Sequence, residues 1–242
     1  KRLSHKYGFK IIEDASHALG AKYYNKNVGN CRYSDVTVFS FHPVKIITSA
    51  EGGMVTTNNK KLAEKIRLLR SHGITKDKYQ FINKNPEPWQ YEQLFLGYNY
   101  RMNDVEAALG LSQLKRVKKI IQTRNAIAQK YNKKLSMLPL CLPKIEKNYY
   151  SSFHLYVIRL NLDDLKKTHS QIFRELRKEG LGVNLHYEPI YNQPYYKKFN
   201  FKKKDFLNSE KYVNEAISIP LFPNISNKEF NNVVKVLKKV II

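Results

Sequence analysis

The sequence predicts an α/β fold, because short apolar runs alternate with amphipathic helical patterns along the chain. Runs short enough to be strands occur at 9–12, 36–42 and 54–57, and each is followed by polar residues or a proline. After the third run, leucine and isoleucine recur at helical spacing over 62–69. Such alternation is typical of a layered α/β domain.

The first two predicted strands lead into polar residues. The run 9–12 is expected to be a buried strand that ends at Asp14. In the strand 36–42, side chains alternate between the two faces, so Ser40 and His42 point to the same side. Ligands of open α/β sheets gather beyond the carboxyl ends of strands, so these positions are candidates for a binding site.

The third strand leads into a helix and then into a long irregular segment. Asn58 or Asn59 is placed to cap the helix at its N-terminus. From Gly73 to Leu96 the sequence is polar, aromatic and broken by Pro86 and Pro88. So long an excursion is unusual in a compact domain unless it is functional, and we interpret it as a lid or a dimer arm.

Two further helices are expected before a linker. Asn103 precedes Glu106 at the spacing of a capping box, and the helical pattern continues to Ile120. Another helix is expected over 125–138. The segment 139–147 is interpreted as a linker, which predicts a domain boundary at this point.

The segment 139–242 is expected to form a smaller α+β domain. Its predicted elements, in order, are a strand at 153–160, a helix with capping-box residues Thr168 and Gln171 that ends at Gly180, a strand at 183–187, and a last helix with capping-box residues Ser226 and Glu229. The aromatic residues between 149 and 156 are expected to belong to the core.

The composition argues against two classes of function. The net charge is +23, but the lysines are scattered as pairs and triplets, so we expect solvated faces and no nucleic-acid partner. No apolar run approaches the roughly 18 residues of a membrane span, and the first residues lack the apolar core of a signal peptide. We therefore expect a cytoplasmic protein that does not interact with membranes.

The two cysteines predict neither a metal site nor a disulfide framework. Cys31 and Cys141 lie far apart in the sequence, and neither has a second cysteine nearby. We expect two reduced thiols and no bound metal.

Lys45 and Asp14 suggest the chemistry of a carbonyl cofactor. A lysine amine can form a Schiff base with such a cofactor, and enzymes that use pyridoxal phosphate (PLP) pair this lysine with a carboxylate. Asp14 is the matching acid at a strand end. The same residues also fit a surface lysine and a strand-end acid, so the spacing alone leaves both interpretations open.

Several sequence blocks resemble the nucleotide-sugar aminotransferases of the DegT/DnrJ/EryC/StrS type, in the order of that family. They are Glu13–Ala21, Ser40–Lys45, Glu51–Val55, Gly97–Met102 and His186–Tyr191. The resemblance covers essentially the whole chain. Within the family, the sequence looks most similar to the pseudaminic acid branch. It implies a fold-type-I PLP-dependent aminotransferase, with part of the large α/β domain at 1–138 and the smaller C-terminal domain at 139–242.

The resemblance also implies roles for the residues of a PLP site. Lys45 matches the Schiff-base lysine, and Asp14 matches the acid that faces the ring nitrogen. His17 lies where relatives carry Gln or His near the phenolic oxygen, and Ser40 matches a phosphate-binding hydroxyl. Asn99 matches the asparagine that reaches the cofactor phosphate of the neighbouring subunit, which implies a homodimer with shared active sites.

His186 and Tyr187 match the part of the smaller domain that approaches the sugar nucleotide. The implied reaction moves an amino group from L-glutamate to the 4-keto carbon of a UDP-linked 4-keto-6-deoxy-N-acetyl sugar. Alternatives are an aminotransferase for another keto nucleotide sugar, linked to dTDP or GDP, and a catalytically silent fragment. Relatives carry a long additional segment ahead of the matching blocks, so we expect this chain to be an N-terminally truncated portion.

Overall fold

The computed structural model describes residues 1–242, and the chain divides into two compact units. The N-terminal unit consists of Lys1–Lys118 together with Asn148–Ser152. The C-terminal unit consists of Lys119–Lys147 together with Phe153–Ile242. Each unit is described by itself.

The predicted domain boundary at 138/139 stays a prediction. In this chain the packing changes earlier, at Lys119, within helix α4 (Val117–Leu135). The reason is that the buried side of α4, including Ile127 and Tyr131, belongs to the core of the C-terminal unit.

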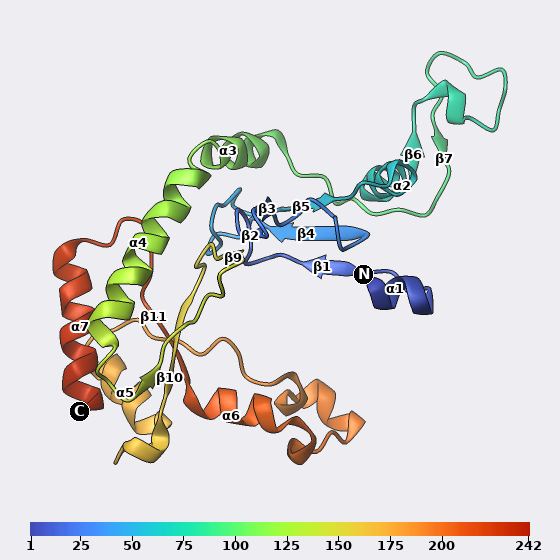
Figure 1. Ribbon diagram of the computed structural model, residues 1–242. Coiled ribbons are helices and arrows are strands. Elements are labelled where there is room, and N and C mark those ends of the chain that lie inside the picture. Colours follow the sequence, from blue (N-terminus) through green and yellow to red (C-terminus); the bar gives the residue numbers. More distant parts are fainter. The chain divides into compact units, whose positions relative to one another are not determined.

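The N-terminal unit is built on a small mixed sheet. Its elements are α1 (Arg2–Tyr7), β1 (Ile12–Asp14), β2 (Lys22–Tyr23), β3 (Lys26–Asn27), β4 (Val36–Ser40), β5 (Gly53–Thr56), α2 (Lys60–Arg70), β6 (Ile74–Thr75), a 3₁₀ turn (Lys78–Gln80), β7 (Glu92–Gln93), α3 (Asp104–Leu114) and β9 (Tyr149–Tyr150). The main sheet has the order β1-β4-β5, with β1 parallel and β5 antiparallel to β4 (Figure 1). The α/β class is thereby confirmed for this unit.

Strand β1 differs from the buried strand that the sequence predicts. It starts at Ile12 rather than at Phe9, and the side chain of Ile12 is 73% exposed. In this sheet β1 is an edge strand, whose only neighbour is β4. Strand β4 also ends earlier than predicted, at Ser40 instead of His42, where the chain enters the turn that carries Lys45.

The predicted excursion between Gly73 and Leu96 is held by a short two-stranded ladder. Strands β6 and β7 pair antiparallel, with Ile74 opposite Gln93, and a long loop joins them beyond α2 (Figure 1). Both oxygens of the Glu92 carboxylate accept backbone N–H groups from this loop, at 2.6 and 2.8 Å. The structure thus shows a hairpin-based arm, while its role as a lid or dimer arm stays a prediction.

The helix starts follow the predicted caps, whereas one pair of helix boundaries was wrong. Asn59 caps α2, and Asn103 and Glu106 form the capping box of α3. However, α3 ends at Leu114, and α4 runs without interruption from Val117 to Leu135. The predicted break between 120 and 125 is absent because no glycine or proline interrupts this stretch, and its apolar residues lie on the buried side of α4.

The C-terminal unit places helices on an antiparallel sheet of order β11-β10-β8. Besides most of α4, its elements are β8 (Leu140–Cys141), β10 (Tyr156–Leu160), α5 (His169–Lys178), α6 (Leu207–Glu215), β11 (Ala216–Ile219), α7 (Asn227–Ile241) and 3₁₀ turns at Leu162–Asp164, Ile190–Asn192, Pro194–Phe199 and Lys203–Phe206. The predicted linker 139–147 therefore contains a strand, and α6 and β11 were not predicted. The predicted strand at 183–187 is reduced to one bridge between Asn184 and Ser218, because β11 occupies the place beside β10.

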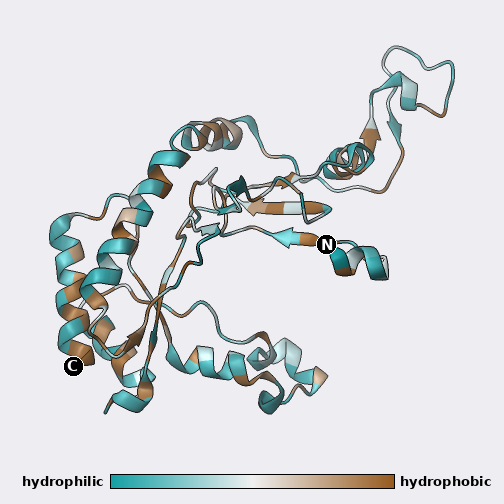
Figure 2. Cartoon of the chain, in the orientation of Figure 1, coloured by the Kyte–Doolittle hydropathy of each residue, from teal (hydrophilic) through white to brown (hydrophobic).

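One apolar core fills the C-terminal unit. It joins buried residues of α4, β10, α5, β11 and α7, and Figure 2 shows apolar residues alternating with polar ones along α7, as an amphipathic helix requires. The capping boxes predicted for α5 and α7 are both present. Arg124 is buried here and donates from one guanidinium nitrogen to three carbonyls, those of Phe153, His154 and Leu221, at 3.0–3.2 Å.

The tyrosine-rich stretch before β10 is divided between two environments. Phe153 and Tyr156 are buried, as predicted, but Tyr149 and Tyr150 form the exposed strand β9 beside β2. Both cysteines are free thiols, Cys31 buried and Cys141 exposed. No helix has the length and apolar character needed to cross a membrane.

Candidate active site

Asp14 lies at the end of β1 with its carboxylate open to solvent. Its Oδ1 accepts two hydrogen bonds from Ser16, from the backbone N–H at 3.0 Å and from the hydroxyl at 2.6 Å. The next residue, Ala15, is buried, and its N–H donates to the carbonyl of Val38 on β4 at 2.8 Å. The backbone at the strand end is therefore fixed to β4, while the carboxylate faces outward.

The surroundings of Asp14 keep its carboxylate ionised. The hydroxyl of Ser16 and then its N–H lower the pKa of Asp14 below the usual range, and the positive charges of His17 and Lys45 act in the same direction. Burial acts in the opposite direction, with an effect that is smaller than that of Ser16 but larger than that of either His17 or Lys45. The electrostatic influence of His17 and Lys45 also places both residues in the neighbourhood of Asp14.

Lys45 is carried by a turn that follows β4. The N–H of Lys45 donates to the carbonyl of His42 at 2.9 Å, and the next two residues, Ile46 and Ile47, are buried. The side chain of His42 lies 3.9 Å from the carboxylate of Glu51. The turn is thus anchored by apolar side chains directly after the lysine, which leaves Lys45 itself half-buried at the surface of the unit.

Hydrogen bonds join the segments that precede and follow this turn. The carbonyl of Phe41 accepts the N–H of Ser49 and the hydroxyl of Thr48, both at 3.0 Å, while its N–H donates to the carbonyl of Gly52 at 2.8 Å. Gly52 has a φ of +145°, and a Cβ there would lie 2.6 Å from the Ser49 hydroxyl. A side chain at position 52 would therefore force this loop apart.

Ser40 and Asn99 lie on different segments of the N-terminal unit, β4 and the chain between β7 and α3. Ser40 is the half-buried last residue of β4, and its Oγ accepts the N–H of His42 at 3.4 Å. Asn99 is exposed and forms an isolated bridge with Ser71, next to the C-terminus of α2. The structure therefore leaves the Asn99 side chain accessible, and it places Ser40 on the strand that leads to Lys45.

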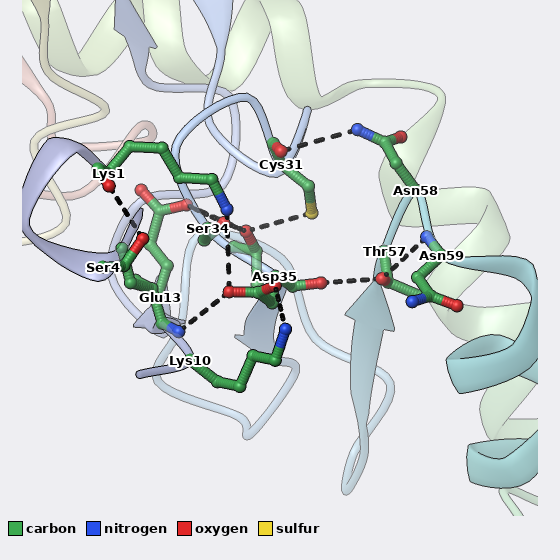
Figure 3. A network of polar contacts seen from close by, with 12 residues as sticks. Lys1, Ser4, Lys10, Glu13, Cys31, Ser34, Asp35, Thr57, Asn58 and Asn59 are labelled. Carbon is green, nitrogen blue, oxygen red and sulfur yellow. Dashed lines mark hydrogen bonds and ion pairs between the residues drawn. The ribbon is translucent and has the colours of Figure 1, made fainter. Parts of the chain in front are cut away.

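A buried chain of hydroxyl groups supports the strand that carries Asp14. The carboxylate of Glu13 accepts a hydrogen bond from Thr37 at 2.8 Å and one from Ser34 at 3.3 Å, and the two hydroxyls lie 3.1 Å apart. The thiol of Cys31 lies 3.5 Å from the Thr37 hydroxyl. Figure 3 shows Glu13 of β1 beside Ser34 and Cys31, which lie on the loop that leads into β4.

Asp35 holds the opposite end of the β1–β4 pair. Its carboxylate accepts the N–H of Ile11 at 3.0 Å and lies 3.7 Å from the amines of both Lys1 and Lys10 (Figure 3). The Ile11 N–H, followed by the two lysines, lowers the pKa of Asp35. The short strand β1 is therefore held by carboxylates at both of its ends.

His186 and Tyr187 belong to the C-terminal unit. The Nδ1 of His186 lies 2.8 Å from the hydroxyl of Ser218, and its carbonyl accepts the hydroxyl of Tyr212 at 2.8 Å. Tyr187 is exposed and packs edge-on against the His186 ring, with centroids 4.8 Å apart. The structure thus fixes the His186 ring and leaves Tyr187 accessible.

The structure gathers Asp14, His17 and Lys45 in one neighbourhood, and it adds residues that the sequence did not single out. Ser16 lies inside a recognised block but was given no role, and the pairing of Glu13 with Thr37 needs the parallel register of β1 and β4. The signal for Ser16 was local, because a serine two residues after an aspartate commonly bonds its side chain. The signal for Thr37 required the three-dimensional register.

A strand-end acid near a lysine-bearing turn, on a mixed α/β sheet, is an arrangement that enzymes with a carbonyl cofactor use. The family model for DegT/DnrJ/EryC1/StrS aminotransferases matches residues 1–238. The chain therefore belongs to the DegT/DnrJ/EryC1/StrS aminotransferase family.

Curated relatives cover almost the whole chain. An uncharacterized protein of Methanocaldococcus jannaschii is 38% identical over 99% of this chain and 62% of its own length. A UDP-4-amino-4,6-dideoxy-N-acetyl-beta-L-altrosamine transaminase of Campylobacter jejuni is 39% identical over 94% of this chain and 57% of its own length. The chain thus spans less than two thirds of the length of these relatives.

Solved structures share the fold. Helicobacter pylori PseC, an aminotransferase involved in the biosynthesis of pseudoaminic acid, matches with a TM-score of 0.87 at 33% identity, over 99% of this chain and 62% of that one. The PMP-form of a putative sugar aminotransferase from Streptococcus pneumoniae matches with a TM-score of 0.86 at 27% identity, over 99% of this chain and 59% of that one. These matches confirm the predicted aminotransferase fold.

Proposed function

We propose that the protein is a PLP-dependent aminotransferase that moves an amino group from L-glutamate to the 4-keto carbon of a UDP-linked 4-keto-6-deoxy-N-acetyl sugar, for pseudaminic acid or a related surface glycan. The observation that carries the proposal is the Lys45 turn beside an ionised Asp14 in a chain of this family. The names of the Campylobacter and Helicobacter relatives support the sugar class.

The donor set of the N-terminal unit fits PLP. Lys45 supplies an amine, Asp14 a carboxylate whose lowered pKa keeps it charged at neutral pH, and Ser40 a hydroxyl at a strand end. A related aminotransferase from Streptococcus pneumoniae has been solved in a PLP-form and a PMP-form. We infer that Lys45, Asp14, Ser40 and His17 are the residues of this chain that hold the cofactor.

The side chains divide the work of amino transfer. PLP, when bound, would supply an aldehyde carbon that takes up the amino group of the donor and a ring that withdraws electrons from the reacting centre. The amine of Lys45 holds and moves a proton at Nζ, as a general base and then as a general acid. Asp14 offers a fixed negative charge, which favours a protonated ring nitrogen, and Ser40 offers a hydrogen bond to a phosphate oxygen.

Two further assignments concern partners of the site. We propose that Asn99, which is exposed, reaches the cofactor phosphate in a second copy of the protein, so that the active enzyme is a homodimer. We also propose that His186 and Tyr187 contact the sugar nucleotide, with the ring of His186 oriented by Ser218.

The test is amino transfer by the full gene product, meaning this chain together with any segment that its gene encodes ahead of Lys1. With L-glutamate and the UDP-linked 4-keto sugar, we expect 2-oxoglutarate and the 4-amino sugar in equal amounts. The variant Asp14→Asn should lose most of the rate, whereas Asp163→Asn, in an exposed 3₁₀ turn of the C-terminal unit, should keep it.

Two outcomes would contradict the proposal at different levels. Turnover restricted to dTDP- or GDP-linked keto sugars would refute the substrate assignment and leave the aminotransferase assignment standing. No amino transfer to any keto nucleotide sugar, with PLP and glutamate present, would refute the reaction itself.

A further inference from the structure

The two oxygens of the Asp14 carboxylate are in different situations. Oδ1 accepts both the N–H and the hydroxyl of Ser16, at 3.0 and 2.6 Å. Oδ2 accepts no hydrogen bond from the chain. Asp14 is exposed, so Oδ2 is the oxygen that is left available for a ligand.

The backbone on both sides of Asp14 is fixed, so Asp14 cannot turn to another face of the strand. Neighbouring residues of a strand point to opposite faces, so the anchoring of Glu13 fixes the face on which Asp14 lies. The carboxylate of Glu13 accepts hydrogen bonds from Thr37, whose side chain is fully buried, and from Ser34. On the other side of Asp14, Ala15 is buried and bonded to β4. The remaining freedom is the rotation of the carboxylate itself.

Ser16 removes that remaining freedom. A serine hydroxyl that bonds a charged carboxylate at 2.6 Å forms a charge-assisted hydrogen bond, which is short and strong for its kind. Because the N–H of the same residue reaches the same oxygen, the two bonds together define the plane of the carboxylate. Glu13 and its hydroxyl partners fix the position of β1, and Ser16 fixes the orientation of the Asp14 carboxylate.

We propose that Ser16 is a positioning residue, which engages Oδ1 of Asp14 and thereby presents Oδ2 to the ring nitrogen of PLP. This inference rests on the proposed function, because Oδ2 would accept a hydrogen bond from the protonated ring nitrogen of PLP. A second consequence follows from the same bonds, since they favour the charged form of Asp14 over the protonated form.

The test compares PLP binding by the full gene product and by Ser16→Ala as a function of pH. We expect Ser16→Ala to bind PLP about three- to tenfold more weakly near neutral pH, since a hydrogen bond to a charged group is lost. We also expect the acidic limb of the binding profile to move to higher pH, because the pKa of Asp14 rises toward its ordinary value. Ser16→Thr, which keeps a hydroxyl, should restore both properties.

Two controls separate positioning from general damage. Ser136→Ala removes a hydroxyl that bonds only a helix-end carbonyl in the C-terminal unit, and it should leave PLP binding and its pH profile unchanged. The melting temperature of Ser16→Ala without PLP is measured alongside, since a purely structural serine would lower it and leave the acidic limb of PLP binding in place.

The outcomes distinguish this inference from the function on which it rests. A parent protein that binds PLP, together with a Ser16→Ala variant of unchanged affinity and unchanged acidic limb, would overturn the role of Ser16 alone. A parent protein that binds no PLP would overturn the proposed function and this inference together, and it would be seen before any variant is compared.

Discussion

The two units of the chain are stabilised in different ways. The C-terminal unit has a continuous apolar core that joins three helices to a sheet, whereas the N-terminal unit buries few large apolar side chains and leaves β1 at a sheet edge. In the N-terminal unit, hydrogen bonds of Glu13, Asp35 and Asp14 do much of the positioning. Around the residues with chemistry, the backbone is therefore held by polar contacts together with single buried side chains such as Ala15, Ile46 and Ile47, and not by one continuous apolar core.

Replacing Lys45 should have the largest effect on activity and almost none on stability. If the N-terminal unit carries the chemistry, Lys45→Ala should reduce amino transfer by about a thousandfold, within the usual range for the loss of a general acid–base group. Its melting temperature should hardly change, because Lys45 is only half-buried. Lys134→Ala, in the last turn of α4, is the matched control and should retain the parent rate.

Truncating the core of the C-terminal unit should have the opposite effect. Leu237 on α7 is fully buried in the apolar cluster, so Leu237→Ala should lower the free energy of unfolding by about 3 kcal/mol through lost burial and a residual cavity. Denaturant unfolding measures the change. A loss below about 1 kcal/mol would show that this core is not what stabilises the unit.

The hydroxyl chain beneath Asp14 should show an intermediate effect. Thr37→Val keeps the shape of a fully buried side chain but removes the 2.8 Å bond to Glu13, and it should cost about 1–3 kcal/mol of unfolding free energy. PLP affinity should fall with it, because β1 loses an anchor. Thr123→Val on α4, outside this network, should change neither quantity, and equal effects of both variants would argue against the network.

Acid should weaken both units by a smaller amount. The pKa of Asp35 is lowered mainly by the Ile11 N–H, and that of Glu229 mainly by the Ser226 hydroxyl. A lowered pKa in the folded state gives stability that is complete above the unfolded pKa, near 4, and is lost as the pH falls toward the folded value. Asp35→Asn and Ser226→Ala should each make the acid unfolding curve shallower, and unchanged curves would contradict these assignments.

The sequence predicted local features better than long-range ones. The caps at Asn103, Thr168 and Ser226 were confirmed, and of the two candidates Asn58 and Asn59 the structure selects Asn59, because a cap depends only on residues within one turn. The missing strand at 183–187 and the unexpected β11 show the limit, since either segment could have paired with β10. A short apolar run does not indicate which of two candidate segments will pair with a given strand.

The site shows the same division between local and long-range signals. The block that contains Lys45 and the block that contains Asp14 could be recognised separately, and the structure brings the two residues into one neighbourhood. The support from Thr37 could not be predicted, because it depends on the register Glu13↔Thr37 between parallel strands. The exposure of Ile12 could not be predicted either, since an apolar run does not indicate whether its face of the sheet is covered.

The central claim is that Lys45 is the residue that bonds PLP, and one measurement tests it directly. The full gene product is incubated with PLP, reduced with borohydride, digested and analysed by mass spectrometry. We predict a visible absorbance band before reduction and a covalent label on the peptide that contains Lys45, both absent from Lys45→Ala. A label on another lysine, or a band that persists in Lys45→Ala, would contradict the account.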